Sequence, residues 1–328
     1  MFKKIVDFIK RKNVRINETH EMLRNTYSHI RSPKVNLGGL QASMNLQKDR
    51  IENLSEVEFQ VFSQFGDDGI IQYLVSKLPL KNKTFIEFGV EDYRESNTRF
   101  LLVNNAWSGL VMDGSATHIQ KIRSEQMYSF YDLRAVQAFI TAENINGLIQ
   151  SAGFHPEVGI LSVDIDGNDY WVWKAIDCIK PSIVITEYNS LFGFEDPFTI
   201  PYKPDFVRGK QTPLNFYGTS LLSACQLAKQ KGYFFIGCNS AGNNAYFIHE
   251  SLRNHCPIAE KTPEQGYNFA IFSETWDERK EPRRGKHKVL SIDGLGVVHT
   301  GSMETLRFPA EKIIQSLKQS GKFRGIEQ

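Results

Sequence analysis

From residue 62 onward the chain alternates two kinds of block: short apolar runs, and longer runs with apolar positions at helical spacing. Strands buried on both faces and separated by amphipathic helices are typical of a parallel sheet covered by helices on both sides. The pattern predicts strands over 83–90, 109–112, 138–141, 158–167 and 182–187. It predicts helices over 69–78, 96–105, 116–125, 145–152, 170–179 and 219–231.

Two further apolar runs, 233–237 and 244–249, are close enough in the chain to pair as a hairpin. The order of elements therefore predicts an α/β, Rossmann-like fold with a seven-stranded, mostly parallel sheet. The last strand of that sheet is expected to run antiparallel to the others. A final helix is predicted over 309–318.

The pattern also divides the chain into segments. Residues from about 13 to 58 are polar and weakly periodic, and residues 1–58 are predicted to form an N-terminal helical extension. Residues 59–275 carry the α/β pattern. Within the latter, residues 190–217 are too long and aperiodic for a simple connection, and we expect them to form a lid. Residues 276–328 are basic and polar, with strand-like residues around Val289, and are interpreted as a C-terminal appendage.

Composition and charge argue against several classes of protein. The formal net charge is only +2 over 328 residues, so the chain lacks the overall positive field that holds nucleic acid, and no nucleic-acid partner is expected. The four cysteines form no CxxC pair and lie mostly in apolar stretches, which indicates reduced thiols and a cytoplasmic protein. No apolar run approaches the roughly 18–20 residues of a spanning helix.

Residues 1–12 place Phe2, Ile5, Val6 and Ile9 near one face of a helix and lysines on the other. Charge interrupts the apolar run, which excludes a signal peptide. Two interpretations stay open. The segment packs on its own domain or on a partner, or it rests as a basic amphipathic helix on the inner face of a membrane.

Four of the five leading strands end in an acid: Glu87, Asp113, Asp164 with Asp166, and Glu187. Ligands of open α/β sheets bind at the carboxyl ends of the strands. Aspartate is also a common cap and turn residue, so each acid has a structural alternative. Together at one edge of one sheet, the acids predict a binding site.

The turn after the first strand favours a cofactor without a pyrophosphate. Gly89 permits a tight turn, Glu87 suits a cationic amino-acid group, and Asp113 suits the two hydroxyls of a ribose. A nicotinamide dinucleotide is the competing interpretation, but the G-x-G-x-x-G pattern that it requires is absent. S-adenosylmethionine has no pyrophosphate and is the predicted cofactor.

Several segments resemble the FkbM-type methyltransferases of bacterial surface-polysaccharide gene clusters, and the order of elements resembles the class I methyltransferase sheet. The motifs that carry the resemblance are 63–69, 85–89 with 97–98, 107–113, 140–145 and 161–167. The resemblance implies S-adenosylmethionine as methyl donor and transfer to an oxygen, commonly of a sugar. The chain departs from the family where Glu91 to Arg94 replace the usual second glycine of the first loop.

Positions in these motifs imply individual roles. By the resemblance, Glu87 and Gly89 hold the methionine end of the cofactor and Asp113 holds the ribose. The other cofactor contacts that it implies are Gln64, Asn97, Thr141, Glu143, Asn144 and Asp164.

Carboxylate and amide oxygens gather after the fourth and fifth strands, and these are the ligands that Mg²⁺ prefers. Similarity to metal-dependent O-methyltransferases of the catechol and macrocin types implies that Asp166, Glu187 and Asn189 hold Mg²⁺ against two sugar hydroxyls. The metal then lowers the pKa of the hydroxyl to be methylated. The structural alternative is that an acid caps the next helix while Glu187 pairs with a basic side chain.

Transfer to a hydroxyl also requires a general base, and the candidates are Asp166 and His249, the latter at the end of the last strand. The sequence thus predicts an O-methyltransferase for a sugar, nucleotide sugar or sugar-linked group in capsule or O-antigen polysaccharide biosynthesis. Two alternatives remain. One is a small-metabolite O-methyltransferase, and the other is a non-catalytic methyltransferase-fold scaffold in a glycan assembly complex.

Overall fold

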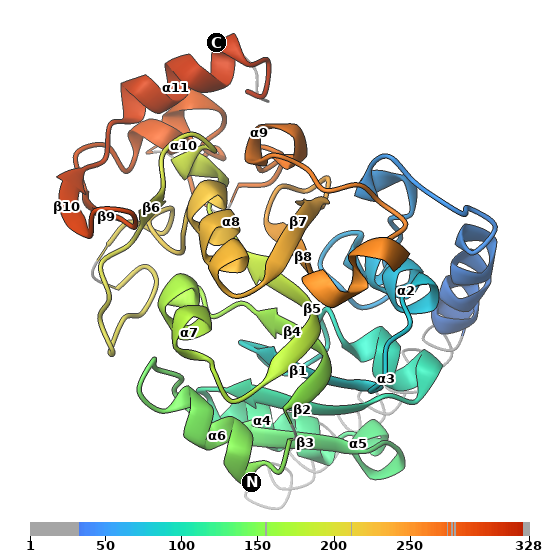
Figure 1. The fold of residues 1–328 in the computed structure, drawn as a ribbon. Coiled ribbons are helices and arrows are strands. Elements are labelled where there is room, and N and C mark those ends of the chain that lie inside the picture. The colour runs from blue at the N-terminus through green and yellow to red at the C-terminus, as the bar shows by residue number, and fades with distance from the viewer. Residues whose placement is uncertain are drawn as a thin grey trace, which may run out of the picture.

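The computed structural model describes residues 33–154, 156–210, 212–273, 275–276, 278 and 280–323. Within these residues the centre of the molecule is a seven-stranded sheet with the order β3-β2-β1-β4-β5-β8-β7 (Figure 1). The strands are β1 Thr84–Phe88, β2 Ser108–Asp113, β3 Leu133–Gln137, β4 Glu157–Val163, β5 Lys180–Glu187, β7 Tyr233–Cys238 and β8 Asn244–His249. Six of them are parallel, and β8 is antiparallel to both of its neighbours. The predicted fold class is confirmed.

Helices cover both faces of this sheet (Figure 1). The helices of the described residues, some of which lie beyond the sheet, are 33–45, α2 Asp67–Lys77, α3 Arg99–Asn105, α4 Ala116–Ser124, α5 Gln126–Phe130, α6 Ile145–Ser151, α7 Asp169–Ala175, α8 Leu221–Gln230, α9 Pro263–Gly266, α10 Lys286–Leu290 and α11 Ala310–Gln319. Along β1, Phe85 belongs to the core formed with α2, α3 and α4, whereas Ile86 and Phe88 belong to the core formed with α6, α7 and α8. Burial on both faces explains why the central strands are apolar without alternation.

The third strand is not where the sequence indicated. We expected residues 138–141, but β3 is Leu133–Gln137, and residues 138–141 form the loop that follows it. In the main sheet β3 pairs only with β2, so it is an edge strand whose Arg134 and Gln137 side chains are exposed. A half-exposed strand lacks the continuous apolar run that marks the others.

The strand expected around Val289 is also wrong, because Val289 lies in the short helix α10. Two strands follow instead, β9 Gly296–His299 and β10 Glu304–Arg307, and β9 pairs with β6 Phe198–Thr199 to form a second sheet of the order β10-β9-β6. The segment interpreted as an appendage is thereby joined to the segment interpreted as a lid.

The helix α11 packs on the same core as the sheet, with Ile313 and Leu317 buried beside Phe192. The division of the chain at 58, 190, 217 and 275 stays a prediction. The amphipathic segment 1–12 lies outside the described residues. Among the helices that the structure does describe, none combines the length and apolarity that crossing a bilayer would require.

Candidate functional site

A pocket of about 350 Å³ opens at the carboxyl edge of the sheet, where β1, β2 and β4 end. This volume falls in the range of small-molecule sites. The lining residues are Gly89, Glu91, Met112, Asp113, Gly114, His118, Ala138, Phe139, Ile140, Ile165, Asp166, Asn168, Phe206, Val207 and Arg208. Of the residues singled out in the sequence, Gly89, Asp113 and Asp166 are in this lining.

Gly89 sits where two loops touch. Its φ is +69°, and a Cβ built there would lie 1.8 Å from the carbonyl oxygen of Asp164. No other residue fits that position, because L-residues disfavour this φ and the clash is with main chain. The glycine therefore holds the turns after β1 and β4 against each other at the wall of the pocket.

Glu87 organises the loop after β1. Its carboxylate accepts hydrogen bonds from the Ser96 hydroxyl at 2.6 Å, the Asn97 N–H at 2.8 Å and the Thr98 N–H at 3.1 Å. Burial raises the pKa of Glu87 above its usual value, and these hydrogen bonds oppose that shift. Because the carboxylate is occupied by its own loop and is not in the pocket lining, a direct contact with a cofactor stays a prediction.

Asp113, at the end of β2, has both oxygens placed by neighbouring groups. Oδ2 accepts from the Glu91 N–H at 2.9 Å, and Oδ1 accepts from the Ser115 N–H at 2.8 Å and lies 3.0 Å from His118 Nδ1. Each carboxylate oxygen has two lone pairs, so Oδ2 retains one acceptor position. The side chain is thus fixed at the pocket wall with capacity for a ligand hydroxyl.

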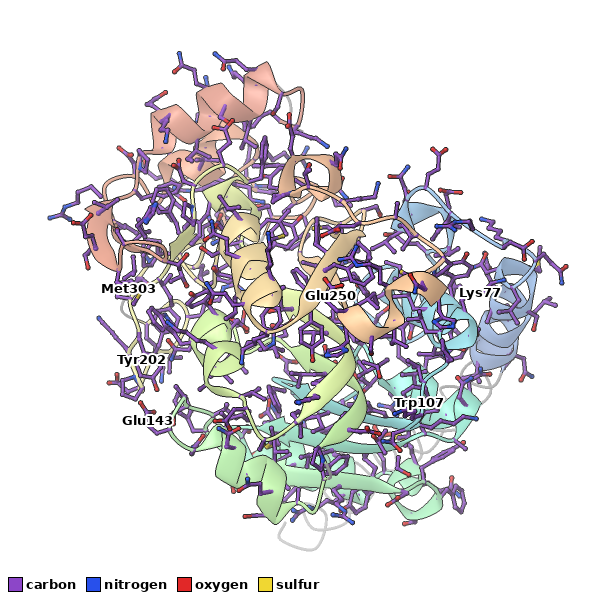
Figure 2. All side chains as sticks on the ribbon, in the orientation of Figure 1. Lys77, Trp107, Glu143, Tyr202, Glu250 and Met303 are labelled. Carbon is purple, nitrogen blue, oxygen red and sulfur yellow. The ribbon has the colours of Figure 1, made fainter. Side chains whose placement is uncertain are left out.

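Three of the cofactor contacts implied by the resemblance, Thr141, Glu143 and Asn144, are engaged by neighbouring protein groups, and their contact with a cofactor stays a prediction. Thr141 and Asn144 hydrogen bond to each other's main-chain N–H, at 2.9 and 3.3 Å, and shape a turn. The Glu143 side chain points to Tyr202, and its carboxylate oxygen Oε2 accepts a hydrogen bond from the Tyr202 hydroxyl oxygen at 2.5 Å (Figure 2). None of the three is in the pocket lining, which takes Phe139 and Ile140 from the same loop.

Two further residues implied by the resemblance lie outside the pocket lining. Gln64 is exposed, and its carbonyl accepts from the Gln60 side chain at 2.9 Å. Asn97 is buried, and its amide donates to the Ser162 hydroxyl at 3.1 Å. Both contacts support the loops around the site.

Beside the pocket, Asp164, Asp166 and Glu187 bring carboxylate oxygens within 4.8 Å of one another. We call these three residues the carboxylate cluster. Burial, and then repulsion within this group of acids, raises the pKa of Asp164 and of Glu187 well above their usual values. Glu187 Oε2 is buried and has no hydrogen-bond partner among the described residues. A cation or a proton is therefore needed there.

The lid segment supplies a cation that the sequence had not singled out. The Arg208 guanidinium donates to Asp166 and lies over the ring of Tyr217, 3.8 Å from its centroid. It also donates from Nε to the Leu214 carbonyl at 2.8 Å. Arg208 lies in an aperiodic loop, so only its position in the predicted lid pointed toward the site.

Asp169 binds the main chain of the loop that precedes α7 and does not cap that helix, whose N-cap residue is Asn168. It accepts from the N–H groups of Ile165 at 2.8 Å and Gly167 at 2.9 Å, and so fixes the loop between β4 and α7. Burial raises its pKa to about 6. This leaves the carboxylates of Asp164 and Asp166 directed to the cluster.

The Asn189 amide is engaged by the main chain around it, and its role as a metal ligand stays a prediction. Its Oδ1 accepts from the Leu191 N–H at 3.0 Å, and its Nδ2 donates to the carbonyls of Asn215 and Tyr217. The amide is thus used to cap a short turn and to hold the lid. Asp164, which the resemblance assigned to the cofactor, is the third carboxylate of the cluster.

His249 lies at the wrong edge of the sheet for the predicted general base. Because β8 runs antiparallel, its first residue Asn244 pairs with Glu187, while His249 pairs with Tyr233 at the start of β7. The end of β8 is therefore at the amino edge of the parallel strands, a strand length away from the carboxylate cluster. Its ring contacts Ser251 instead.

Comparisons with known proteins give structural likeness alone. No family model matches the chain, and no curated protein matches it. The order of the sheet decides the fold. It is a class I methyltransferase fold.

Solved structures with partial likeness include an S-adenosylmethionine-dependent methyltransferase from Clostridium acetobutylicum ATCC 824, with TM-score 0.36 and 12% identity over 56% of this chain and 90% of that one. A second is precorrin-6y C5,15-methyltransferase from Geobacter metallireducens GS-15, with TM-score 0.35 and 12% identity over 58% and 90%. A third is an O-methyltransferase from Bacillus cereus in complex with SAH, with TM-score 0.31 and 12% identity over 51% and 72%.

Proposed function

We propose that this chain is an S-adenosylmethionine-dependent O-methyltransferase. The observation that carries the proposal is the juxtaposition of a pocket and a carboxylate cluster at the carboxyl edge of a methyltransferase-type sheet. The pocket is bordered on one side by Gly89 and Asp113, and Asp166 belongs both to its lining and to the cluster. The side at Gly89 and Asp113 suits the nucleoside of a cofactor. The side at Asp166 suits an acceptor whose hydroxyl group must lose a proton.

The residues present fit the cofactor. Asp113 has an acceptor position at the pocket wall for a ribose hydroxyl, and Met112, Phe139 and Ile140 give apolar surface for an adenine ring. The single close turn at Gly89 leaves no second glycine for a pyrophosphate. When bound, S-adenosylmethionine supplies an electrophilic methyl group, while Asp113 and the turn orient it.

At the other side, the carboxylate cluster would act on the acceptor. Asp166 is exposed in the pocket lining and can accept the proton of an acceptor hydroxyl at a carboxylate oxygen. Arg208, which donates to Asp166, would hold that carboxylate in place. The predicted lid segment contributes Phe206, Val207 and Arg208 to the lining of the same pocket.

We extend the proposal to a divalent cation, Mg²⁺, held by Asp164, Asp166 and Glu187 in place of the predicted set that included Asn189. Three carboxylates within 4.8 Å and a buried Glu187 oxygen without a partner fit a hard cation with oxygen ligands. A cation in this position would lower the pKa of a coordinated hydroxyl.

The acceptor that we propose is a sugar hydroxyl, on a sugar or a nucleotide sugar in surface-polysaccharide assembly. The resemblance to the FkbM-type enzymes supports it. A cytoplasmic location is proposed with it, because Cys178, Cys225, Cys238 and Cys256 are all free thiols.

The deciding experiment is calorimetric titration of the purified chain with S-adenosylhomocysteine and, separately, with NAD⁺, each with Mg²⁺ and with a chelator. We expect S-adenosylhomocysteine to bind and NAD⁺ not to bind. Binding of neither would overturn the proposal and favour the non-catalytic scaffold. With binding established, methyl transfer from labelled donor to nucleotide sugars rather than to small phenols would separate the sugar acceptor from a small metabolite.

A further inference from the structure

The helix of residues 33–45 has two different faces. On its inner face Gly38 lies so close to the molecule that a Cβ there would be 2.4 Å from Val61 and 2.9 Å from Phe100. On the same side, the buried Asn45 amide donates to the Val57 carbonyl at 2.8 Å. The helix is therefore docked through Gly38, Asn45 and the partly buried Val35, at the edge of the molecule next to α2 and α3 (Figure 1).

The outer face is apolar. Leu37, Leu40 and Met44 are 65%, 59% and 64% exposed, and their spacing of three and four residues aligns them along one side of the helix. Leu46, just beyond, is 40% exposed. We call Leu37, Leu40 and Met44 the outer stripe. Other exposed apolar side chains in the described ranges occur singly or in pairs such as Leu214 with Trp276, whereas three align along the outer stripe, so this grouping calls for a partner.

Charge identifies the kind of partner. Residues 1–48 contain ten Lys and Arg against three Asp and Glu, whereas the remaining 280 residues contain 29 against 34. No acidic residue occurs between positions 22 and 48. The basic charge of the chain is thus concentrated in the segment that carries the outer stripe, while the rest of the chain is acidic overall. This asymmetry favours a polyanionic partner.

An apolar stripe and a positive field together fit a lipid surface. Nucleic acid would satisfy the charge but would leave three aliphatic side chains in water. A second copy of this chain would meet like charge, and three side chains offer far less than the roughly 800 Å² per partner of a stable interface. An anionic bilayer provides both headgroup charge and an apolar layer within reach of a surface helix.

We propose that residues 33–48 dock on an anionic bilayer, with the outer stripe in the headgroup boundary. Lys34 lies exposed at the start of the helix. Beside its end, the Lys77 ammonium group donates to the Leu46 carbonyl at 3.0 Å (Figure 2). The proposal is independent of the methyltransferase assignment, because it requires neither the pocket nor the carboxylate cluster.

The test is co-sedimentation of the full chain with phosphatidylcholine vesicles, with and without phosphatidylserine, at low and high salt. We expect binding to the anionic vesicles that weakens in high salt. The variant L37S/L40S/M44S should bind at least about tenfold more weakly. A matched control, F130S/I271S/L306S, removes three exposed apolar side chains elsewhere and should bind as the wild type does.

Folding of each variant is checked by its melting temperature. As an independent readout, Leu37→Trp should show a blue shift in its difference fluorescence when anionic vesicles are added. Failure of the wild type to bind, or equal binding by both triple variants, would overturn the proposal. So would a wild-type dimer that L37S/L40S/M44S dissociates in the absence of vesicles, because the stripe would then be assigned to a second copy.

Discussion

Gly89 is the position where a single atom decides the shape of the candidate site. We expect Gly89→Ala to cost about 2 kcal/mol or more of unfolding free energy, since the new Cβ would meet the Asp164 carbonyl and the φ of +69° is strained for alanine. Urea unfolding measures this cost, and titration with S-adenosylhomocysteine should show binding lost. Gly147 in α6 is the control: nothing lies within 4 Å of its Cβ position, so Gly147→Ala should be neutral or stabilise by up to about 1 kcal/mol.

Mutations on the two sides of the pocket should affect different properties, cofactor binding at Asp113 and methyl transfer at Asp166. Asp113→Ala removes the acceptor at the pocket wall and should weaken S-adenosylhomocysteine binding by about tenfold or more. Asp166→Asn should leave that binding within about twofold while abolishing methyl transfer. Calorimetry and a labelled-methyl assay on both variants check this. Loss of cofactor binding in both, or in neither, would contradict the separation.

Several residues of the candidate site could be predicted because the end of a buried strand can be recognised in a sequence. An acid after an apolar run, as at Asp113 or Asp166, falls at the carboxyl edge whatever the details of packing. Arg208 could not be predicted in the same way, because its place depends on how an aperiodic loop folds back. For Asn189 the strand end was predicted correctly, but the main-chain groups that occupy its amide come from residues 191, 215 and 217.

At the scale of elements, the antiparallel direction of β8 places His249 at the amino edge of the parallel strands, away from the candidate site. His249 was predicted near the acceptor because it ends a strand, but that strand was also expected to run antiparallel, and its reversed direction places His249 at the opposite edge. We therefore expect His249→Ala to leave methyl transfer within about twofold of the wild type. A methyl-transfer assay over a range of pH checks this. A loss of activity comparable to that of Asp166→Asn would show that His249 does act as a base.

The C-terminal helix α11 should behave as part of the core. Leu317 is fully buried in the same apolar cluster as Phe192 and Val184, so Leu317→Ala should cost about 2–5 kcal/mol. Urea unfolding followed by far-ultraviolet circular dichroism should show one cooperative transition at a lower midpoint. Two transitions, with only a minor one shifted, would indicate that residues beyond 275 form an independent unit.

Most of the fold could be predicted at this scale, and the exceptions share a cause. The interior strands were located because burial on both faces makes them apolar throughout. The edge strand β3 and the short strands β6, β9 and β10 are exposed or are two to five residues long. Short or exposed strands of this kind form because of the strands with which they pair. The apolar pattern of a single sequence does not show which segments will pair.

For the whole molecule, buried carboxyls set a pH dependence of stability. Burial raises the pKa of Asp68 from 3.8 to about 6 against the hydrogen bonds that it accepts from Val61, Phe62 and Ser63. The folded state then binds this proton more tightly than the unfolded chain. The stability from Asp68 is therefore fully present below a pH of about 4 and is lost as the pH rises through about 6.

The measurement is the unfolding free energy of the wild type and of Asp68→Asn over that pH interval. The variant is expected to be less stable at low pH, because asparagine cannot reproduce all of the hydrogen bonds. The readout is the slope: the advantage of the wild type should shrink as the pH rises. Parallel profiles would show that Asp68 does not change its proton occupancy on folding.

The pairing of β6 with β9 joins positions 198–199 to positions 298–299, and this has a consequence for how the protein is made. On the ribosome, the lid segment emerges about a hundred residues before its partner strand does. The contacts of Arg208 to Asp166, Leu214 and Tyr217 do not need that strand, but one edge of the lid segment does. Until β9 has emerged, Phe198 and Thr199 lack their partners on that edge.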